Sequence, residues 1–376
     1  MFNCYIEDGF IVIVYHDTNQ SSREILAQDL IHKVSLIIEN APVKDLVFAF
    51  QGEPLNKDFY NKIFSVVPSL QDAYPYCNVK IFTGIEPTDE NYQHYLNMCN
   101  VNNWKPIEVV MSNNWEAALG KNTFLHDQSI PYTATKRQKV FLNLNAGIKY
   151  HRLHFMAEVL HRGLFDKGYM SFLGGGGGTI NGTLLAFLQN QLNLKKYFPK
   201  RHTIIAETMI RNINLFPLIL DNQPDPDNMT DWLTKHQHSS NDLLKFYNDS
   251  YLSVVSETTF YSHNIVQDGD YDAVFFSEKT WKPISLNHPF IIGSNKNSLA
   301  TLRKKGYQTF TPFINESYDD LEGEERTLAI VEELERLSKQ SDEEWMQWQE
   351  NVKPMVEHNH QHLKYMNKIT KTYTGE

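Results

Sequence analysis

The sequence predicts an α/β protein made of two units in series, each with an open parallel sheet. Short apolar runs alternate with segments of helical periodicity over the first 135 residues, a polar connector follows at 114–138, and the alternation restarts at residue 139. Strands and helices in alternation imply βαβ units, whose strands run parallel. At 376 residues the chain is also long for one core and comfortable for two.

The first unit is predicted from short apolar runs. Residues 10–15, Phe-Ile-Val-Ile-Val-Tyr, have the composition of a buried parallel strand. Residues 23–39 then place apolar side chains at helical spacing. The later elements of this unit are strands at 45–50, 79–82 and 107–111, with a helix around 59–67.

The second unit repeats the pattern. Its predicted strands lie at 139–144, 169–173, 251–255, 273–276 and 289–292, and its first helix at 150–162. The last 50 residues are mostly helical, with Trp345 and Trp348 on an apolar face. Pro354 is expected to kink or end that helix, because proline lacks the N–H that a helix interior needs.

Composition and charge narrow the functional classes. The net charge is −10, and residues 322–368 carry eleven Asp or Glu against six Lys or Arg. An acidic chain is a poor candidate for non-specific nucleic-acid binding, which needs a basic surface. The N-terminus carries acids before its apolar run, unlike a secretion signal, and no apolar run has the length of a membrane span. Three cysteines without metal-like spacing favour a reducing compartment, so we expect a cytoplasmic protein.

The stretch most suggestive of chemistry spans residues 275–284. There an apolar strand is predicted to run into Ser277, Glu278 and Lys279, where a helix begins. A helix N-terminus exposes unpaired N–H groups and attracts phosphate, and Lys279 and Lys282 add cations in the same turn. The Glu278 carboxylate can accept both hydroxyls of a ribose diol. A helix cap with a solvated lysine is the alternative interpretation.

Two segments upstream also place polar residues after predicted strands. Glu257 can point into the same cleft, although a glutamate in this position is more often a helix cap or a surface acid. Residues 143–152 run from a strand through a polar turn, which begins at Asn145, into a helix with Lys149 and Arg152. Arg152 can bind an anion or extend from the helix towards solvent.

Taken together, these segments resemble the donor site of a known enzyme family. Val255–Thr258, Ser277–Thr280 and Pro289–Gly293 resemble, in order and spacing, the signature of the fucosyltransferase-type GT-B glycosyltransferases. That family has a Phe-Glu-Asn-Ser-like element, then a Thr-Glu-Lys segment, then a strand beginning Pro-(Ile/Val)-x-x-Gly. This chain lacks the aromatic residue before Glu257 and the asparagine after it, and Trp281–Pro283 replaces the usual apolar helix start, which leaves the donor sugar open.

The resemblance implies a GT-B fold, with two Rossmann-like domains, a central cleft and a C-terminal crossing helix. Residues 1–135 would form the N-terminal acceptor domain, and residues 139–340 the nucleotide-sugar donor domain. Residues 341–376 would form a helix that packs back across both domains. A cleft between two such domains is a natural binding pocket.

Roles of individual residues also follow from the resemblance. Glu278 would hold the donor ribose, Lys279 the donor phosphates, and Glu257 would lie near the sugar. The family keeps an arginine at the first strand-to-helix junction of the donor domain, and Arg152 is the best match. Such an arginine neutralises the leaving diphosphate, which other folds achieve with a metal ion. The remaining donor-binding candidates are Asn145, Lys149, Ser277 and Lys282, with His151 as a lesser one.

The expected activity is an inverting, metal-independent sugar transfer from a nucleotide-diphosphate sugar to a hydroxyl acceptor, with no cofactor and no bound metal. Inversion needs a base to deprotonate the acceptor, and in the family this carboxylate comes from the N-terminal domain. Glu53 and Asp17, which follow predicted strands, are the two candidates for this catalytic residue.

The acceptor and the class of activity stay open. A glycan, a lipid-linked saccharide or a small molecule would suit an acidic enzyme. A hydroxymethylated DNA base is an alternative, because the Ser277–Pro283 sequence resembles segments of phage-encoded proteins, although the net charge argues against it. The rival from another class is a non-catalytic module that kept the nucleotide-sugar pocket. The oligomeric state is not predicted.

Three further motifs carry less weight. The five glycines from Gly174 to Gly178 match no phosphate-binding fingerprint and are interpreted as a flexible loop. His358 and His362 would share a helix face and His360 would point away, and all three are expected at the surface. The segment 223–228 has two aspartates, but its prolines favour an extended loop over a metal site.

Overall fold

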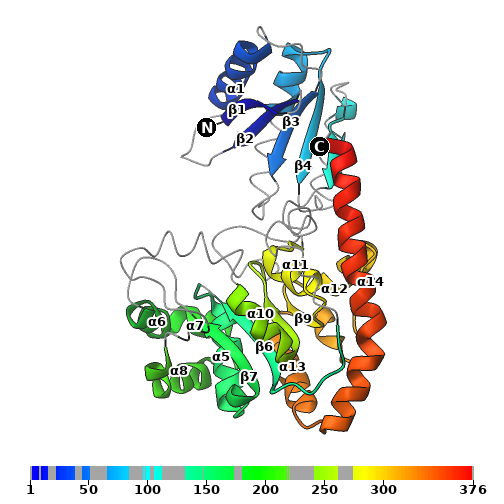
Figure 1. Ribbon diagram of the computed structural model, residues 1–376. Coiled ribbons are helices and arrows are strands. Elements are labelled where there is room, and N and C mark those ends of the chain that lie inside the picture. The colour runs from blue at the N-terminus through cyan, green and yellow to red at the C-terminus, as the bar shows by residue number, and fades with distance from the viewer. Residues whose placement is uncertain are drawn as a thin grey trace.

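The protein, as a computed structural model, is an α/β protein with two separate sheets, which confirms the predicted fold class (Figure 1). No helix in the described part of the chain combines the length and the apolar character needed to cross a membrane. The structure describes residues 2–7, 10–15, 23–38, 45–50, 66–83, 96–97, 99–101, 106–111, 132–145, 147–172, 180–216, 218, 220, 241–260 and 274–374.

The first sheet has its five strands in chain order. They are β1 (Phe2–Glu7), β2 (Phe10–Tyr15), β3 (Asp45–Phe50), β4 (Asn78–Thr83) and β5 (Glu108–Met111). The strands β2 to β5 run parallel, as predicted, and β1 is an antiparallel edge strand that the sequence analysis missed. Glu7 pairs with Phe10, so Asp8 and Gly9 separate the two strands, and Asp-Gly is typical of a tight hairpin. Helix α1 (Arg23–Ile38) buries Leu30 and Val34 in the core of this unit.

The second sheet has four parallel strands in the order β7-β6-β8-β9. Their bounds are β6 (Lys139–Asn145), β7 (Gly168–Phe172), β8 (Ser250–Ser256) and β9 (Phe290–Gly293). From β6 the chain first adds β7 on one side and later β8 on the other, so the strand order reverses between β6 and β8. Open α/β sheets bind ligands at such a point, beyond the carboxyl ends of the strands. The topology therefore makes the ends of β6 and β8 the place where a binding site is expected.

Helices cover both faces of the second sheet. The helices of this unit are α5 (Tyr150–His161), α6 (Ile180–Gln189), α7 (Gln191–Tyr197), α8 (His202–Arg211), α10 (Asn241–Asn248), α11 (Glu278–Ser285), α12 (Ser298–Lys304), α13 (Gly323–Leu337) and α14 (Asp342–Thr374). On one face Phe141 of β6 contacts Phe155 of α5, with ring centroids 6.4 Å apart. Its neighbour Leu142 lies in a cluster with Phe246 and Tyr247 of α10. Successive residues of a strand point to opposite faces, so both faces of this strand are apolar.

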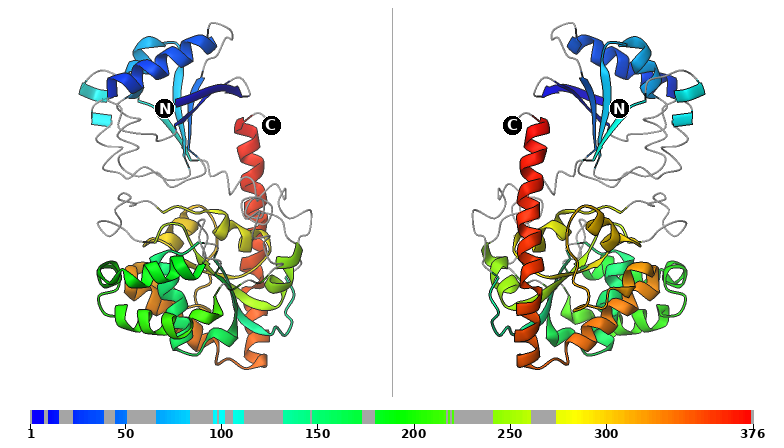
Figure 2. Two further views of the ribbon diagram at one scale, coloured as in Figure 1. Left: turned by 90° about the vertical axis from the view of Figure 1, so that its left-hand side faces the viewer. Right: turned by 90° about the vertical axis from the view of Figure 1, so that its right-hand side faces the viewer.

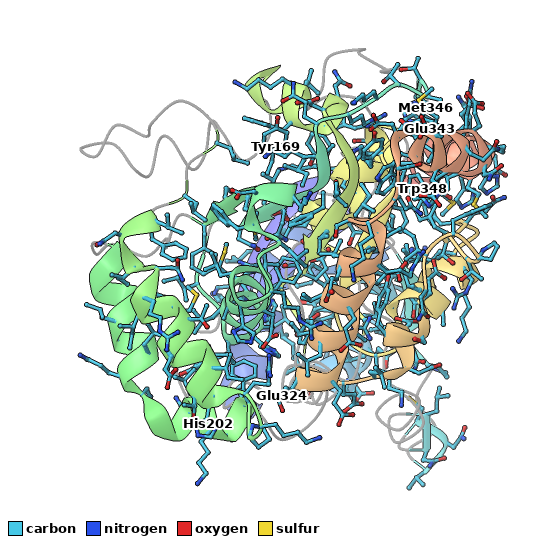
Figure 3. All side chains as sticks on the ribbon, turned by 90° about the horizontal axis from the view of Figure 1, so that it is seen from below. Tyr169, His202, Glu324, Glu343, Met346 and Trp348 are labelled. Atoms are coloured by element: carbon cyan, nitrogen blue, oxygen red, sulfur yellow. The ribbon has the colours of Figure 1, made fainter. Side chains whose placement is uncertain are left out.

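Helix α14 runs from the base of the second unit to the level of the first sheet (Figures 1 and 2). Trp345 and Trp348 belong to the core of the second unit, whereas Met346 is exposed (Figure 3). Of the two effects predicted for Pro354, an end of the helix is excluded, because Pro354 lies within α14. Val352 and Val356 on either side are buried in the core, and this packing holds the helix together across the missing N–H.

Two further expectations are wrong. The strand predicted at 273–276 is absent from the described residues 274–277, and β8 pairs directly with β9. Its apolar residues Phe275 and Phe276 are instead buried beneath the start of α11. Of the three histidines expected at the surface, His360 is buried, whereas His358 is exposed and His362 is partly exposed.

Helix α5, which carries Arg152 near its start, is anchored near its end by a buried carboxylate. Arg201 of α8 donates to both oxygens of Glu158, at 2.8 and 2.7 Å, and the buried His154 lies 3.6 Å from the same group. Burial alone would raise the pKa of the Glu158 carboxyl, but His154 and Arg201 outweigh burial and lower that pKa to about 2. This pair therefore holds α5 and α8 together.

We predict that Glu158→Gln removes a pH-dependent part of the stability. Because the folded pKa of about 2 lies below the 4.5 of an ordinary glutamate, the carboxylate stabilises the fold above pH 4.5 and loses this effect as the pH falls towards 2. The contribution at pH 7 is on the order of 3 kcal/mol. The free energy of unfolding, measured by urea denaturation, should fall more between pH 7 and pH 3 for the wild type than for the variant. Glu207→Gln, which breaks an exposed pair with Arg211, is the control and should behave like the wild type.

Candidate functional site

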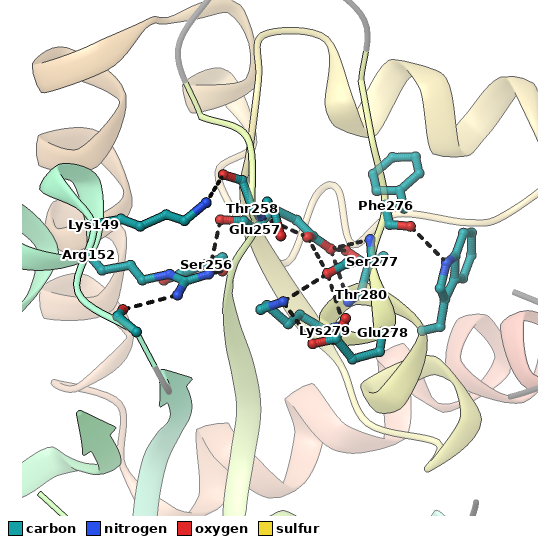
Figure 4. Close-up of polar contacts among 12 residues, drawn as sticks. Lys149, Arg152, Ser256, Glu257, Thr258, Phe276, Ser277, Glu278, Lys279 and Thr280 are labelled. Atoms are coloured by element: carbon teal, nitrogen blue, oxygen red, sulfur yellow. Dashed lines mark hydrogen bonds and ion pairs between the residues drawn. The ribbon is translucent and has the colours of Figure 1, made fainter. Parts of the chain in front are cut away.

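Polar residues gather where the topology places a site, beyond the carboxyl ends of β6 and β8 (Figure 4). Lys149 and Arg152 come from the start of α5, which follows β6. Glu257 directly follows β8, and Ser277 to Lys279 form the start of α11. The structure thus brings together three segments that the sequence analysis selected, although about 100 residues of the chain separate the first from the second.

The carboxylate of Glu257 is fully buried and binds the first turn of α11. Its Oε1 accepts the N–H groups of Ser277 and Thr280, at 3.0 and 3.2 Å, and the Thr280 hydroxyl at 2.6 Å. Its Oε2 accepts the Ser277 hydroxyl at 2.6 Å and the Thr258 N–H at 3.1 Å. A carboxylate at a helix N-terminus is also favoured by the helix dipole. Glu257 therefore caps the first turn of α11 from outside the helix, next to the N-cap residue Ser277. Its expected place near the donor sugar stays a prediction.

The hydrogen bonds to Glu257 leave fewer N–H groups at the start of α11 for an external anion. The sequence analysis expected the free N–H groups there to attract phosphate, but those of Ser277 and Thr280 bind Glu257. The Ser277 hydroxyl, in turn, accepts the Lys279 N–H at 3.4 Å and the Lys279 ammonium at 3.1 Å. An anion at this site must therefore be held mainly by side-chain cations.

The cations of α5 rest on backbone carbonyl groups at the end of β8. Arg152 Nη2 donates to the carbonyls of Ser256 and Glu257, at 3.2 and 3.4 Å, and its Nη1 donates to that of Gly147 at 3.1 Å. Lys149 Nζ donates to the Thr258 carbonyl at 3.0 Å. These contacts orient both side chains. The carbonyl groups that Arg152 contacts are neutral, so they do not compensate the formal charge of its guanidinium.

Arg152 is a buried cation without an acidic partner at contact distance in the described residues. It is 4% exposed, and its Nε finds no hydrogen-bond acceptor among them. Burial lowers the pKa of Arg152, and the charges of Glu257 and Glu278 oppose that change from further away. By contrast, the buried Arg326 forms an ion pair with Asp319 at 3.0 Å. Buried charges are normally paired, so Arg152 indicates a place for an anion from outside.

Glu278 and Lys279 form an ion pair at the mouth of the site. Lys279 Nζ lies 2.7 Å from the Glu278 carboxylate, and both side chains are about one-fifth exposed. Burial alone would raise the pKa of Glu278, but Lys279 outweighs burial and lowers it. One turn later, burial lowers the pKa of Lys282 to about 8. A ligand with both hydroxyl and phosphate groups can separate this pair and bind each half.

Asn145, at the end of β6, is buried among polar groups. Its Nδ2 donates to Asn143 Oδ1 at 2.5 Å, and the Asn143 amide donates to Val254 O at 2.7 Å and Ser256 Oγ at 3.2 Å. Asn145 Oδ1 has no donor among the described residues. The sequence analysis missed Asn143, although a buried asparagine inside an apolar strand is a signal that could have identified it.

Several residues with a predicted role cannot be placed. The candidate bases Glu53 and Asp17 lie outside the described residues, as do Gly174–Gly178 and segment 223–228. In the part of the chain that the structure describes, no group of three or more His, Cys, Asp or Glu side chains could hold a metal ion.

No protein-family model and no curated protein matches this chain. Among solved structures, a UDP-forming α,α-trehalose-phosphate synthase from Burkholderia xenovorans is similar with a TM-score of 0.46 and 8% identity, over 94% of this chain and 77% of the other. The N-terminal domain of trehalose-6-phosphate phosphatase from Candida albicans has a TM-score of 0.43, with 8% identity and the same shares covered. With TM-scores below 0.5, these likenesses carry no weight for the activity, which must be inferred from the contacts of the chain itself.

We predict that Glu257→Gln destabilises the protein by about 2–3 kcal/mol, because an amide nitrogen cannot accept the hydrogen bonds that one carboxylate oxygen now accepts. Urea denaturation at pH 7 measures this change. Glu278→Gln removes the same charge from a more exposed position and should cost less than about 1 kcal/mol. Equal losses in the two variants would show that Glu257 is not the cap on which α11 depends.

Proposed function

We propose that the protein is a GT-B glycosyltransferase that transfers a sugar from a nucleotide-diphosphate sugar to a hydroxyl acceptor, with inversion and without a metal ion. The observation that carries this proposal is the buried, acid-free guanidinium of Arg152 at the switch point of a parallel sheet. A diphosphate is an anion of suitable charge for such a place, and arginine binds phosphate oxygens in a bidentate manner.

The charge of the site supports a diphosphate. Four described cations surround it, and two carboxylates oppose them. The cations are Lys149, Arg152, Lys279 and Lys282, and the carboxylates are Glu257 and Glu278. Side-chain cations of this number can stabilise the leaving group without a divalent ion.

The proposed donor geometry uses the ion pair at the mouth. On donor binding, Lys279 leaves the Glu278 carboxylate for a phosphate oxygen, and the freed carboxylate accepts the hydroxyls of the ribose. Arg152 faces the phosphate next to the sugar. Glu257 contacts both Ser277 and Arg152, so it fixes the start of α11 relative to α5.

In the transfer step, the acceptor oxygen forms a bond to the anomeric carbon as the bond from that carbon to the diphosphate oxygen breaks. The electron pair leaves with the diphosphate, whose developing charge Arg152 and Lys279 stabilise. The acceptor proton goes to a carboxylate of the first unit, for which Glu53 and Asp17 remain the candidates. Attack opposite the leaving group inverts the anomeric configuration.

The two units divide this work. Residues 139–340 bind the donor, and residues 1–135 present the acceptor and the base. Helix α14 reaches from the second unit to the level of the first sheet, and it packs against α11. Closure of the units would exclude water, which limits donor hydrolysis.

We predict that one nucleoside diphosphate raises the melting temperature of the wild type, because a ligand of the folded state alone stabilises it by mass action. A thermal shift panel of UDP, GDP, CDP, ADP and dTDP identifies the base. Arg152→Ala and Lys279→Ala should each lose most of the shift. Lys339→Ala, which removes a lysine of an exposed pair with Glu335, should keep it. A folded protein that responds to none of the five nucleotides would contradict the proposal.

Activity then separates an enzyme from a binding module. The wild type is incubated with sugar conjugates of the selected nucleotide and with glycan, small-molecule and hydroxymethylated DNA acceptors. Product with inverted anomeric configuration by NMR, formed equally with and without EDTA, is the expected result. Nucleotide binding without transfer to any acceptor class would favour the binding module.

Nucleotide affinity should depend on the charge of Lys282. Its pKa of about 8 means that the ammonium is charged below pH 8 and loses its proton as the pH rises above it. We predict that the dissociation constant of the selected nucleotide rises severalfold between pH 7 and pH 9 in the wild type. In Lys282→Gln the constant should be higher at pH 7 and change less. An equal pH dependence of both proteins, measured by calorimetry, would exclude this role.

A further inference from the structure

A polar cavity lies at the end of the second sheet opposite to the proposed donor site. Its volume is about 260 Å³, and it is lined by Tyr132, Thr133, Thr135, Arg137, Tyr247, Asn248, Leu286, Asn287 and His288. These residues directly precede β6, β8 and β9, so the cavity lies at the amino ends of the parallel strands. The proposed donor site lies at the carboxyl ends. The two sites are therefore distinct.

One wall of this cavity is the segment that leads into the second unit, residues 132–137. Gln349 of α14 holds that segment in place. Its Nε2 donates to Thr135 O at 2.9 Å, and its Oε1 accepts Thr135 N–H at 3.4 Å and Arg137 Nε at 3.1 Å. A ligand in the cavity would therefore contact the connecting segment next to its attachment to α14.

Arg137 repeats the pattern of Arg152. It is 8% exposed, and its Nη1 donates to the carbonyls of Tyr247 and Ser250, at 3.0 and 2.7 Å. No carboxylate of the described residues forms an ion pair with Arg137. Its hydrogen bonds to the described residues use Nε and Nη1, and none uses Nη2. The carboxylate of Asp249 is close in sequence, but it accepts the Gln138 N–H and the Tyr169 hydroxyl. A buried guanidinium without an acid again indicates an external anion.

Arg137 is the only cationic side chain among the described lining residues, since His288 is neutral. Burial lowers the pKa of His288 to about 3. Its Nδ1 lies 2.8 Å from Ser253 Oγ and its Nε2 lies 2.7 Å from Ser250 O, so both ring nitrogens are engaged within the protein. The cavity therefore presents one positive charge together with neutral polar groups such as Asn248 and Thr133.

We infer that this cavity is a second ligand site, which binds a small metabolite with one phosphate or carboxylate group through the Arg137 guanidinium. Its volume of about 260 Å³ lies just below the usual range for ligand pockets, roughly 300–1,000 Å³, so it fits a compact anion better than a nucleotide. Because the connecting segment forms one wall, the bound anion would fix that segment on the second unit.

The test uses Thr133, an exposed residue of the cavity wall, in the matched variants Thr133→Glu and Thr133→Gln. The two side chains have nearly the same size, but only glutamate repels an anion. Inorganic phosphate and citrate are titrated by calorimetry, at constant ionic strength, into each variant in an Arg152→Gln background, which weakens the donor site. The same pair in the wild-type background serves if that background does not fold.

The expected result is saturable binding of at least one of the two anions to Thr133→Gln, with affinity at least fivefold lower in Thr133→Glu. The anion that binds more tightly identifies phosphate or carboxylate as the recognised group. Equal affinities in the two variants, or no binding of either anion to Thr133→Gln, would overturn the inference. Nucleotide binding, measured in the wild-type background, should be the same in both variants, so the proposed donor site is tested independently.

Discussion

The candidate site depends on one buried carboxylate. Glu257 directly follows β8, and its side chain binds the first turn of α11 through Ser277 and Thr280. Its backbone carbonyl accepts a hydrogen bond from Arg152. The same carbonyl oxygen lies 3.0 Å from His151 Nε2. One residue thus connects the strand to both helices that carry the cations. An acid placed there costs much to bury, and five hydrogen bonds together with the helix dipole offset that cost.

The arginines of the second unit divide into two groups by their partners. Arg201 and Arg326 bind the carboxylates of Glu158 and Asp319, and these pairs join neighbouring helices and loops. Arg152 and Arg137 bind backbone carbonyls instead. Arg152 lies at the carboxyl ends of the strands of this sheet, and Arg137 lies at their amino ends. Carbonyl oxygens hold a guanidinium in position but leave its charge available. The same physical reasoning therefore supports the diphosphate site and the smaller anion site.

Much of the fold could be predicted because it follows from local pattern. The apolar runs at β2, β3, β4, β6 and β8 are strands, and the helical periods at α1 and α5 are helices, within one or two residues of prediction. Parallel pairing followed from the alternation of these elements. The edge strand β1 could have been predicted from Asp8-Gly9, a hairpin signal that was overlooked. The candidate site was found the same way, since polar residues after parallel strands meet at one edge.

The sequence by itself determined the α/β class, the two-sheet organisation and the residues that gather at the switch point, because periodicity and strand ends are local properties. Only the tertiary structure decided that Glu257 caps α11, that residues 274–277 lead into α11 instead of forming a strand, and that Pro354 lies within α14. It also decided that Arg152 and Arg137 lack acidic partners in the described chain. Hydrogen-bond partners and burial depend on which distant segments pack together, and no local pattern contains that information.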